Sequence, residues 1–350
     1  MYESSLALAL VPYTAGEQPK NQRLIKLNTN ENPYPPSPRV AEALAAGYAS
    51  LRLYPDAEAT AVREAIAGRE GLSPAQVFCG NGPDEVLAFA FAALFAGKIL
   101  AAPDVTYSFY PVYSQLFGVD YRTVPLREDF TVDVEGLMQG CPVVLANPNA
   151  PTGRFLPIAE IERLAAHTRE AGEALLVDEA YAAFAPETAR RLLEGYDNLL
   201  IVRTLSKSHA LAGLRLGYAL GSERLIDALR RVRDSFNSYP VDRLAQLAGA
   251  AAVRDDAYTA EKVKLVCQAR DWTAEALRAR GWEVLPSATN FLFVKAAPAD
   301  AAPVQRRLRE KGILVRHFAS GRLKPWLRIS IGTMEEMERV VEEMGEAEGR

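Results

Sequence analysis

The sequence predicts an α/β fold: a large domain with a mostly parallel mixed sheet sandwiched by helices, and a smaller α+β domain after it. The chain has 350 residues, which suits two domains better than one hydrophobic core. Between residues 77 and 220, short and almost continuously apolar runs alternate with helical stretches, as in strands buried on both faces of a doubly wound sheet. After residue 240 a long helical stretch precedes the order strand, strand, helix, strand, strand, helix, which is typical of a smaller α+β unit.

We expect three parts along the chain: an N-terminal arm over residues 1–37, a large domain over 38–240 and a small domain over 241–350. The arm is rich in Pro, Asn and Tyr, which favours an extended segment with turns. In the large domain, helices are expected at 39–50 and 58–70, and strands at 77–80, 98–102, 119–124, 142–147, 174–181, 198–204 and 216–220. In the small domain, helices are expected at 242–280, at 303–311 and at the C-terminal end, and strands at 282–286, 290–296, 313–318 and 327–332.

Composition narrows the class of protein. The net charge of −4 and the lack of like-charge blocks do not suggest binding to nucleic acid or to an acidic membrane surface. No apolar run reaches the roughly 18 residues of a membrane span, and the N-terminal stretch lacks a basic region and carries Glu3, so no secretory signal is expected. Three scattered cysteines without a CxxC pair favour a reduced, cytoplasmic setting, and three histidines without metal-binding spacing do not indicate zinc.

The segment TLSKSHALAGLRLGYAL, residues 204–220, follows an expected buried strand. The amine of Lys207 can form a Schiff base with an aldehyde cofactor if it is kept neutral in a cleft. Arg215 offers a planar fork suited to a phosphate monoester, and Ser206 adds a hydroxyl beside the lysine. On composition alone, a solvated lysine at a strand–helix junction is the better interpretation, because most lysines are surface residues.

The segment ALLVDEAYAAF, residues 174–184, ends an apolar strand in Asp178. Parallel sheets bind ligands at the carboxyl ends of their strands, where a carboxylate can pair with a protonated pyridine nitrogen. The phenol of Tyr181 can reach a ring oxygen nearby. An equally good interpretation is that Asp178 or Glu179 caps the following helix.

Two turns complete the set of candidate segments. LANPNAPTGRF, residues 145–155, could supply the amides of Asn147 and Asn149, although a plain turn is the simpler interpretation. CGNGPDE, residues 79–85, is a glycine-rich turn that opens a helix near Asp84, and main-chain amides at such a helix start can cradle a phosphate. Many strand–helix turns look similar, so this signal is weak alone.

Together these segments resemble the fold-type I aminotransferases, and most closely the histidinol-phosphate aminotransferases. The resemblance covers nearly the whole chain in order, and the lysine segment is its most specific part. The matching stretches are LNTNENP (27–33), YPD (54–56), GNGPDE (80–85), TYSFYPVY (106–113), NPNAPTG (147–153), VDEAY (177–181), RTLSKSHALAGLRLGY (203–218), ILVR (313–316) and LRISIG (327–332).

The resemblance implies pyridoxal 5'-phosphate as the cofactor and a role for each matching residue. Lys207 would bind its aldehyde and move the proton, Asp178 would hold the pyridine nitrogen, and Tyr181 would bond the 3-oxygen. The ring would stack on Tyr107, for which a buried core tyrosine is the plain alternative. The phosphate-binding group would be Ser206, Arg215 and the amides around Gly82 and Asp84.

The resemblance also implies a homodimer and a substrate site. Tyr54 looks like the tyrosine that reaches the cofactor phosphate of a neighbouring subunit, so the active sites would be shared. Arg328 and Arg316 resemble the pair that receives the anionic end of the substrate. Tyr13 resembles a residue that closes over the substrate, and Asn30 is expected to line the same pocket.

Two positions depart from the family pattern. Ala150 stands where the family usually has Asn, so the amide for the 3-oxygen would come from Asn149 or be missing, which would leave Tyr181 to make the bond. Pro83 stands where relatives often have Ser or Ala, and proline has no N–H for a phosphate.

The implied reaction passes the amino group of glutamate to imidazole-acetol phosphate, which gives L-histidinol phosphate and 2-oxoglutarate. Rivals on the same fold are an aromatic amino acid aminotransferase and a threonine-phosphate decarboxylase. A non-catalytic sensor domain would need a basic DNA-binding module, which the arm is too short to supply. A dinucleotide-binding protein is disfavoured because no GxGxxG follows a strand.

Overall fold

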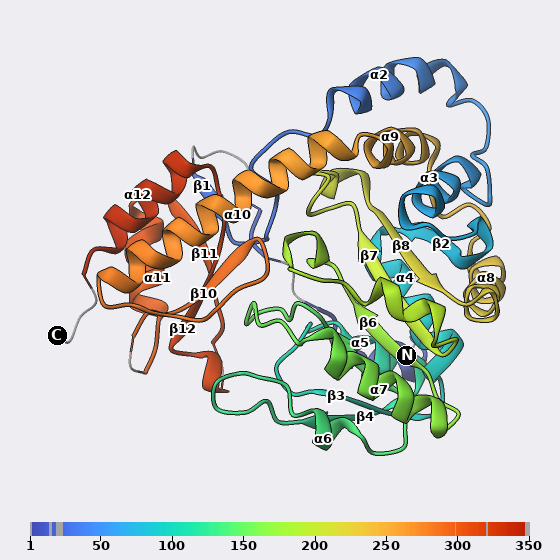
Figure 1. Ribbon diagram of the computed structural model, residues 1–350, viewed down its shortest axis with the longest axis horizontal. Coiled ribbons are helices and arrows are strands. Elements are labelled where there is room, and N and C mark those ends of the chain that lie inside the picture. Colours follow the sequence, from blue (N-terminus) through green and yellow to red (C-terminus); the bar gives the residue numbers. More distant parts are fainter. Residues whose placement is uncertain (1, 14–15, 19–23, 298, 320, 347–350) are drawn as a thin grey trace.

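The computed structural model describes residues 2–13, 16–18, 24–297, 299–319 and 321–346, and it contains a large and a small sheet (Figure 1). The large sheet has seven strands in the order β2-β8-β7-β6-β5-β3-β4. Only β8 runs against its neighbours, so the expected mostly parallel mixed sheet is confirmed. In that order the strands are Val77–Asn81, Leu216–Gly221, Leu199–Thr204, Leu175–Asp178, Val143–Ala146, Ile99–Pro103 and Asp120–Val124.

Both faces of the large sheet are buried except along the edge strand β4, which explains the continuous apolar runs of the inner strands. Successive side chains of a strand point to opposite faces. In β6, Leu175 and Val177 join one hydrophobic cluster and Leu176 joins another. The helices of this part are α2 (Pro38–Gly47), α3 (Thr60–Glu70), α4 (Gly82–Ala90), α5 (Tyr110–Phe117), α6 (Val134–Leu137), α7 (Ile158–Glu170), α8 (Glu223–Phe236) and α9 (Arg243–Arg254).

The small sheet has five strands in the order β1-β11-β12-β10-β9 and encloses its own core with three helices. Its strands are Ile25–Leu27, Ile313–His317, Trp326–Ser330, Phe291–Lys295 and Glu283–Val284. The helices are α10 (Asp256–Ala279), α11 (Ala302–Glu310) and α12 (Met334–Met344), and α10 runs from the large sheet to the small one (Figure 1).

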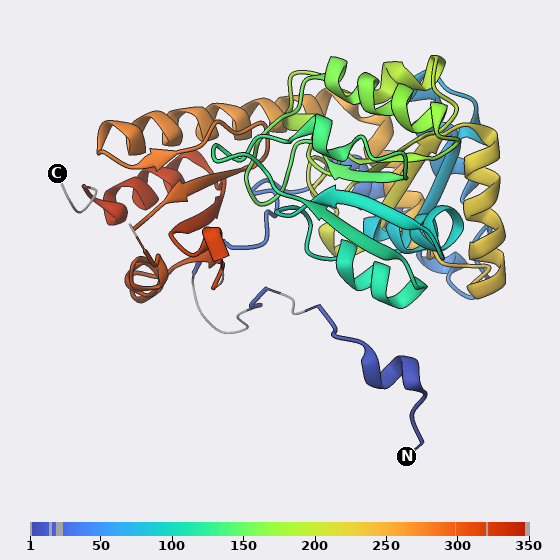
Figure 2. The same cartoon turned by 90° about the horizontal axis from the view of Figure 1, so that it is seen from below.

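The three expected domain boundaries stay a prediction, and two elements pack across them. Strand β1 comes from the arm but pairs in parallel with β11 of the small sheet. Helix α9 lies after residue 240 but packs against α2 and α3 of the large part. Farther toward the N-terminus, α1 (Ser5–Ala9) has no buried residue and lies apart from the two sheets (Figure 2).

The described residues lack a membrane-spanning helix and a metal-binding cluster. None of their helices is both long and apolar enough to cross a membrane. No group of three or more His, Cys, Asp or Glu side chains in this part of the chain could hold a metal ion.

Candidate active site

A cavity of about 430 Å³ lies at the carboxyl ends of β5, β6 and β7. Parallel strands end there on one edge of the sheet, so side chains far apart in sequence meet. The predicted residues that line the cavity are Asp84, Tyr107, Asp178, Tyr181, Ser206, Lys207 and Arg215. The lysine, the carboxylate and the guanidinium that the sequence singled out therefore share one cavity.

Lys207 enters this cavity three residues after β7 ends. Its Nζ donates a hydrogen bond of 3.1 Å to the main-chain oxygen of Thr29. Burial, and next the nearby Arg328 guanidinium, lower the pKa of the Lys207 ammonium to about 8. A larger share of neutral amine is present at neutral pH than for an exposed lysine, which favours attack on an aldehyde.

Asp178 is the last residue of β6 and is buried. Its Oδ2 accepts a hydrogen bond of 3.0 Å from the Tyr110 hydroxyl, and its Oδ1 accepts one of 3.1 Å from the N–H of Ala180. Burial raises the pKa of the carboxyl to about 6, and these two bonds oppose the rise. The group is ionised at pH 7 and suited to a cationic partner.

The N-terminal end of α4 and Arg215 form a narrow cradle. Gly82 has φ of 82°, and a Cβ there would lie 2.6 Å from Nη2 of Arg215. A side chain at Gly82 would therefore collide with the guanidinium. Ser206 adds a buried Oγ that has no hydrogen-bond partner among the described residues, so it is available to a ligand.

Asp84 contributes its carboxylate to this cradle. Oδ2 accepts a 2.8 Å hydrogen bond from Nη2 of Arg215, and Oδ1 accepts one of 2.7 Å from the Tyr107 hydroxyl. A phosphate would therefore share Arg215 with Asp84. Pro83, which lies on the cavity wall, removes one N–H from the helix start.

Asn149 does not face this cavity, contrary to one of the two options left open for the 3-oxygen. Its Nδ2 donates to the main-chain oxygen of Val105 over 3.0 Å and to Oγ1 of Thr152 over 2.9 Å. It lines a separate hollow, while the methyl group of Ala150 forms part of the cavity wall. With both amide hydrogens engaged, Asn149 has no donor left for a ring oxygen.

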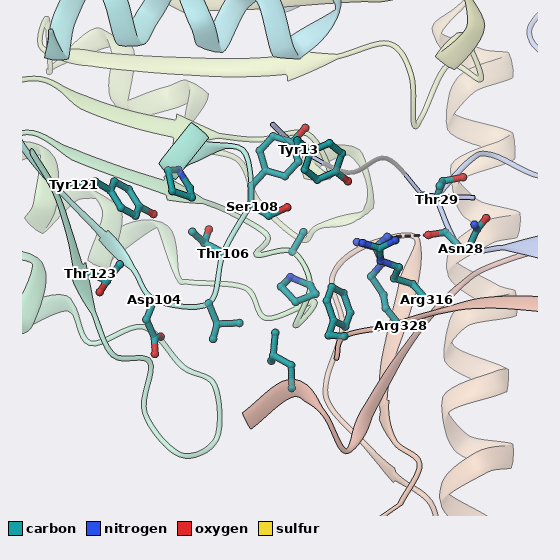
Figure 3. A pocket seen from close by; sticks show the side chains of 18 residues that line it. Tyr13, Asn28, Thr29, Asp104, Thr106, Ser108, Tyr121, Thr123, Arg316 and Arg328 are labelled. Carbon is teal, nitrogen blue, oxygen red and sulfur yellow. Dashed lines mark hydrogen bonds between the residues drawn. The ribbon is translucent and has the colours of Figure 1, made fainter. Parts of the chain in front are cut away.

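A second cavity of about 520 Å³ adjoins the first, and Thr29, Tyr107 and Ala150 belong to the walls of both. Arg316 and Arg328 are paired across the antiparallel strands β11 and β12, and they project into it from the small sheet (Figure 3). Two cations side by side, without a carboxylate partner in the described part of the chain, form a site for an anion.

The two arginines are held by aromatic rings. Nη2 of Arg328 donates to the main-chain oxygen of Asn28 over 3.0 Å, and the guanidinium lies 5.4 Å from the Phe291 ring centre. Both guanidiniums also approach the Phe318 ring, at 5.8 Å and 5.9 Å. Burial and the neighbouring Arg316 guanidinium lower the pKa of Arg328. A bound anion would offset this lowering, because it stabilises the charged guanidinium.

Tyr13 reaches this second cavity, as expected, and its ring centre lies 4.4 Å from that of Phe109. Asn30, contrary to expectation, lines neither cavity. It is 1% exposed and bonds to the hydroxyl of Tyr181 from behind the cavity wall. Tyr54 is 80% exposed, lies outside both cavities and stacks on Tyr239 at 5.0 Å.

Comparison with known proteins decides the family. The sequence profile described as aminotransferase class I and II matches residues 22–344. The chain belongs to this family. A histidinol-phosphate aminotransferase of Acetobacter pasteurianus is 50% identical over 341 residues, with 97% of this chain and 95% of that protein covered. One of Pseudomonas entomophila is 50% identical over 331 residues, with 93% and 94% covered.

A solved structure of a histidinol-phosphate aminotransferase has the same fold. The histidinol-phosphate aminotransferase of Sinorhizobium meliloti, in complex with pyridoxal-5'-phosphate, superposes with a TM-score of 0.87 at 27% identity, with 98% of this chain and 97% of that chain covered. This chain is a pyridoxal-phosphate-dependent aminotransferase of fold type I.

The residues of this aminotransferase fit the cofactor. The unpartnered Ser206 Oγ, the Gly82 cradle beside Arg215, and the buried Asp178 carboxylate suit a phosphate at one end and a protonated ring nitrogen at the other. Lys207 would hold the aldehyde carbon. When bound, the ring supplies an electron sink for the charge released at the α-carbon of the substrate.

Sequence reasoning missed two contributors to the aminotransferase site. Tyr110, within the matched TYSFYPVY stretch, bonds Asp178, but nothing in its spacing distinguishes it from the neighbouring aromatic residues. Thr29 accepts the Lys207 hydrogen bond through its main-chain oxygen, which no side-chain pattern could have indicated.

Proposed function

We propose that this aminotransferase exchanges the amino group between glutamate and the keto compound that corresponds to L-histidinol phosphate. The observation that carries the proposal is the unpaired cationic pair Arg316 and Arg328 beside the cofactor cavity. Two adjacent guanidiniums can receive either a phosphate or a carboxylate. One site can thus accept both substrates in turn. The names of the curated relatives support the same choice.

Different side chains of the site would bind the substrate and transfer its proton. Arg316 and Arg328 orient the anionic end of the substrate, and Tyr13 covers the cavity beside them. The amine of Lys207, once released from the aldehyde carbon, would take the proton from the α-carbon of the substrate and pass it to that former aldehyde carbon, C4′ of the cofactor. Its pKa of about 8 keeps both proton-bound and free forms present near neutral pH.

Rates with three amino donors test the substrate. Purified holoenzyme is incubated with 2-oxoglutarate and L-histidinol phosphate, L-phenylalanine or L-threonine phosphate, and the glutamate formed is measured. We expect the highest kcat/KM for histidinol phosphate. No glutamate from histidinol phosphate, together with turnover of phenylalanine, would assign the aromatic substrate instead. Carbon dioxide release from threonine phosphate would assign the decarboxylase.

We also propose that the enzyme is a cytoplasmic homodimer. Residues 48–54 and 236–239 expose large apolar side chains, which favours an interface. These are Tyr48, Leu51, Leu53, Tyr54, Phe236 and Tyr239. Tyr54 belongs to this surface and lines neither of the two cavities described above, as expected of a residue that serves a neighbouring subunit. The three cysteines are free thiols, which suits a reducing compartment.

A further inference from the structure

A short chain of buried hydrogen bonds runs from the main chain of Asn30 to the phenol of Tyr181. The N–H of Asn30 donates to Oγ of Ser330 over 2.8 Å, and the Ser330 hydroxyl donates back to Oδ1 of Asn30 over 2.8 Å. Nδ2 of Asn30 donates to the Tyr181 hydroxyl oxygen over 2.8 Å. Asn30 and Ser330 are each 1% exposed, so water does not compete for these bonds.

The direction of every bond follows from the first one, because a main-chain N–H can only donate. Ser330 accepts that hydrogen, and Oδ1 of Asn30 receives the hydrogen of the Ser330 hydroxyl. If the Asn30 amide were turned over, its NH2 group would face Ser330 and the buried hydroxyl hydrogen would lose this acceptor. Leaving a buried donor without a partner is costly. The NH2 group of Asn30 is therefore fixed toward Tyr181.

The hydroxyl oxygen of Tyr181 thus accepts a hydrogen from Asn30, and it has no other hydrogen-bond partner in the described part of the chain. Its own hydrogen remains for the cavity that Tyr181 lines. Ala150, on the same wall, offers no donor from its side chain. We propose that Asn30 and Ser330 are positioning residues that hold the phenolic hydrogen of Tyr181 toward the ring oxygen of bound pyridoxal phosphate.

The charged and titratable groups that face Tyr181 come from several elements, and of the variants below only Asn30→Asp adds one. They are Arg328 on β12, Asp178 on β6, Tyr13 in the arm, and Lys207, whose Nζ lies 6.0 Å from the ring centre. Burial raises the pKa of the Tyr181 phenol, which the nearby guanidinium opposes. The phenol is protonated at neutral pH and can serve as a donor.

The experiment titrates the visible absorbance of bound cofactor with pH, without any amino substrate. A donor at the ring oxygen stabilises its anionic form, so loss of the donor raises the pH at which the bound cofactor loses its proton. Asn30→Asp places a carboxylate acceptor opposite the Tyr181 hydroxyl. The phenolic hydrogen should then bond this carboxylate instead of pointing into the cavity. We expect the midpoint to rise by about one to two pH units. Asn30→Ala leaves the hydrogen free to stay in the cavity, so its shift should stay below about half a unit.

A merely structural role predicts the reverse order, because Asn30→Ala leaves a hole and Asn30→Asp nearly preserves the shape. A shift in Asn30→Ala as large as that in Asn30→Asp overturns the proposal. The new negative charge could also raise the midpoint directly, and Tyr181→Phe separates the two effects. In that background only the direct effect of the charge should remain, so the Asn30→Asp shift should be smaller; a shift as large as with Tyr181 present overturns the proposal.

Thermal unfolding of the apoenzyme shows whether Asn30→Asp folds. If it does not, a second pair of variants, at Ser330, tests the proposed positioning of Tyr181. Ser330→Ala removes the acceptor that fixes the Asn30 amide and should raise the midpoint, whereas Ser330→Thr keeps the hydroxyl and should restore it. Equal midpoints in these two variants overturn the proposal. The result does not depend on which amino compound is the substrate, because none is added.

Discussion

Tyr110 donates a hydrogen bond of 3.0 Å to Asp178, and both side chains are buried beneath the cofactor cavity. The bond stabilises the ionised carboxylate, which would hold the protonated ring nitrogen of the cofactor, against the burial that raises the pKa of the carboxyl to about 6. The hydrogen bond therefore keeps the carboxyl ionised to a lower pH than burial alone would allow.

The first prediction follows from the sign of this pKa shift. Below pH 6 the Asp178 carboxyl of the apoenzyme is protonated, so cofactor binding must first remove a proton. The Kd for pyridoxal phosphate should then rise by up to about tenfold per pH unit as the pH falls. Tyr110→Phe removes the stabilising bond and should move this rise to higher pH. Fluorescence titration of the apoenzyme at several pH values measures it.

Tyr113→Phe is the matched control, because the buried Tyr113 hydroxyl has no hydrogen-bond partner among the described residues. Its pH dependence should match that of the wild type. Equal behaviour of the Tyr110 and Tyr113 variants would contradict the assigned role of Tyr110.

The second prediction concerns capture of the cofactor by Lys207. Only the neutral amine attacks an aldehyde, so the association rate should rise with pH around a midpoint of about 8. Arg328→Gln removes a cation that lowers the pKa of this ammonium, and its midpoint should lie higher. Arg316 is not among the largest causes of the Lys207 shift, so Arg316→Gln should move the midpoint less than Arg328→Gln does. Stopped-flow absorbance compares the three proteins, and equal midpoints would refute the Arg328 contribution.

The sequence predicted the fold and most of the cavity because these depend on local signals. Continuous apolar runs gave the buried strands, and the turn after each strand placed Asp178 and Lys207 on one edge. The side-chain partners depend on tertiary contacts instead. Asn30 bonds Ser330, which is 300 residues away in the sequence, so its place behind Tyr181 was not predictable from its neighbours. Asn149 failed as a candidate for a related reason, because Val105 and Thr152 engage its amide.

The third prediction tests the substrate arginines. Arg316→Gln and Arg328→Gln should each lower kcat/KM for histidinol phosphate by about tenfold to a hundredfold, because a hydrogen bond to a charged group is lost. Arg316 makes no contact with the cofactor cavity, so its variant should bind pyridoxal phosphate normally. An Arg316→Gln enzyme with unchanged kcat/KM for both histidinol phosphate and glutamate would place the anion elsewhere.

The fourth prediction concerns a buried ion-pair network next to the site. Arg203 on β7 bonds Glu179 over 2.9 Å and Glu70 over 2.8 Å, and the exposed fractions of the three side chains are 11%, 1% and 11%. Arg203→Met leaves two buried carboxylates without their cation, so the free energy of unfolding should fall by about 3 kcal/mol or more. Arg231→Met, which breaks an exposed pair with Asp227, should have little effect. Urea denaturation of both variants checks this, and equal losses would contradict it.

The last prediction tests whether Tyr54 serves the neighbouring subunit. Lys207→Ala and Tyr54→Ala should each be nearly inactive at limiting cofactor. In a hybrid dimer, the chain with intact Lys207 would receive Tyr54 from its partner, which restores one of the two sites. Random mixing should return about a quarter of the wild-type activity, since half of the dimers are hybrids with one intact site each. Mixing Lys207→Ala with Asp178→Asn is the control, because both residues line the cavity of one chain and no intact site can form. Recovery in neither mixture would mean that Tyr54 acts within its own chain or not at all.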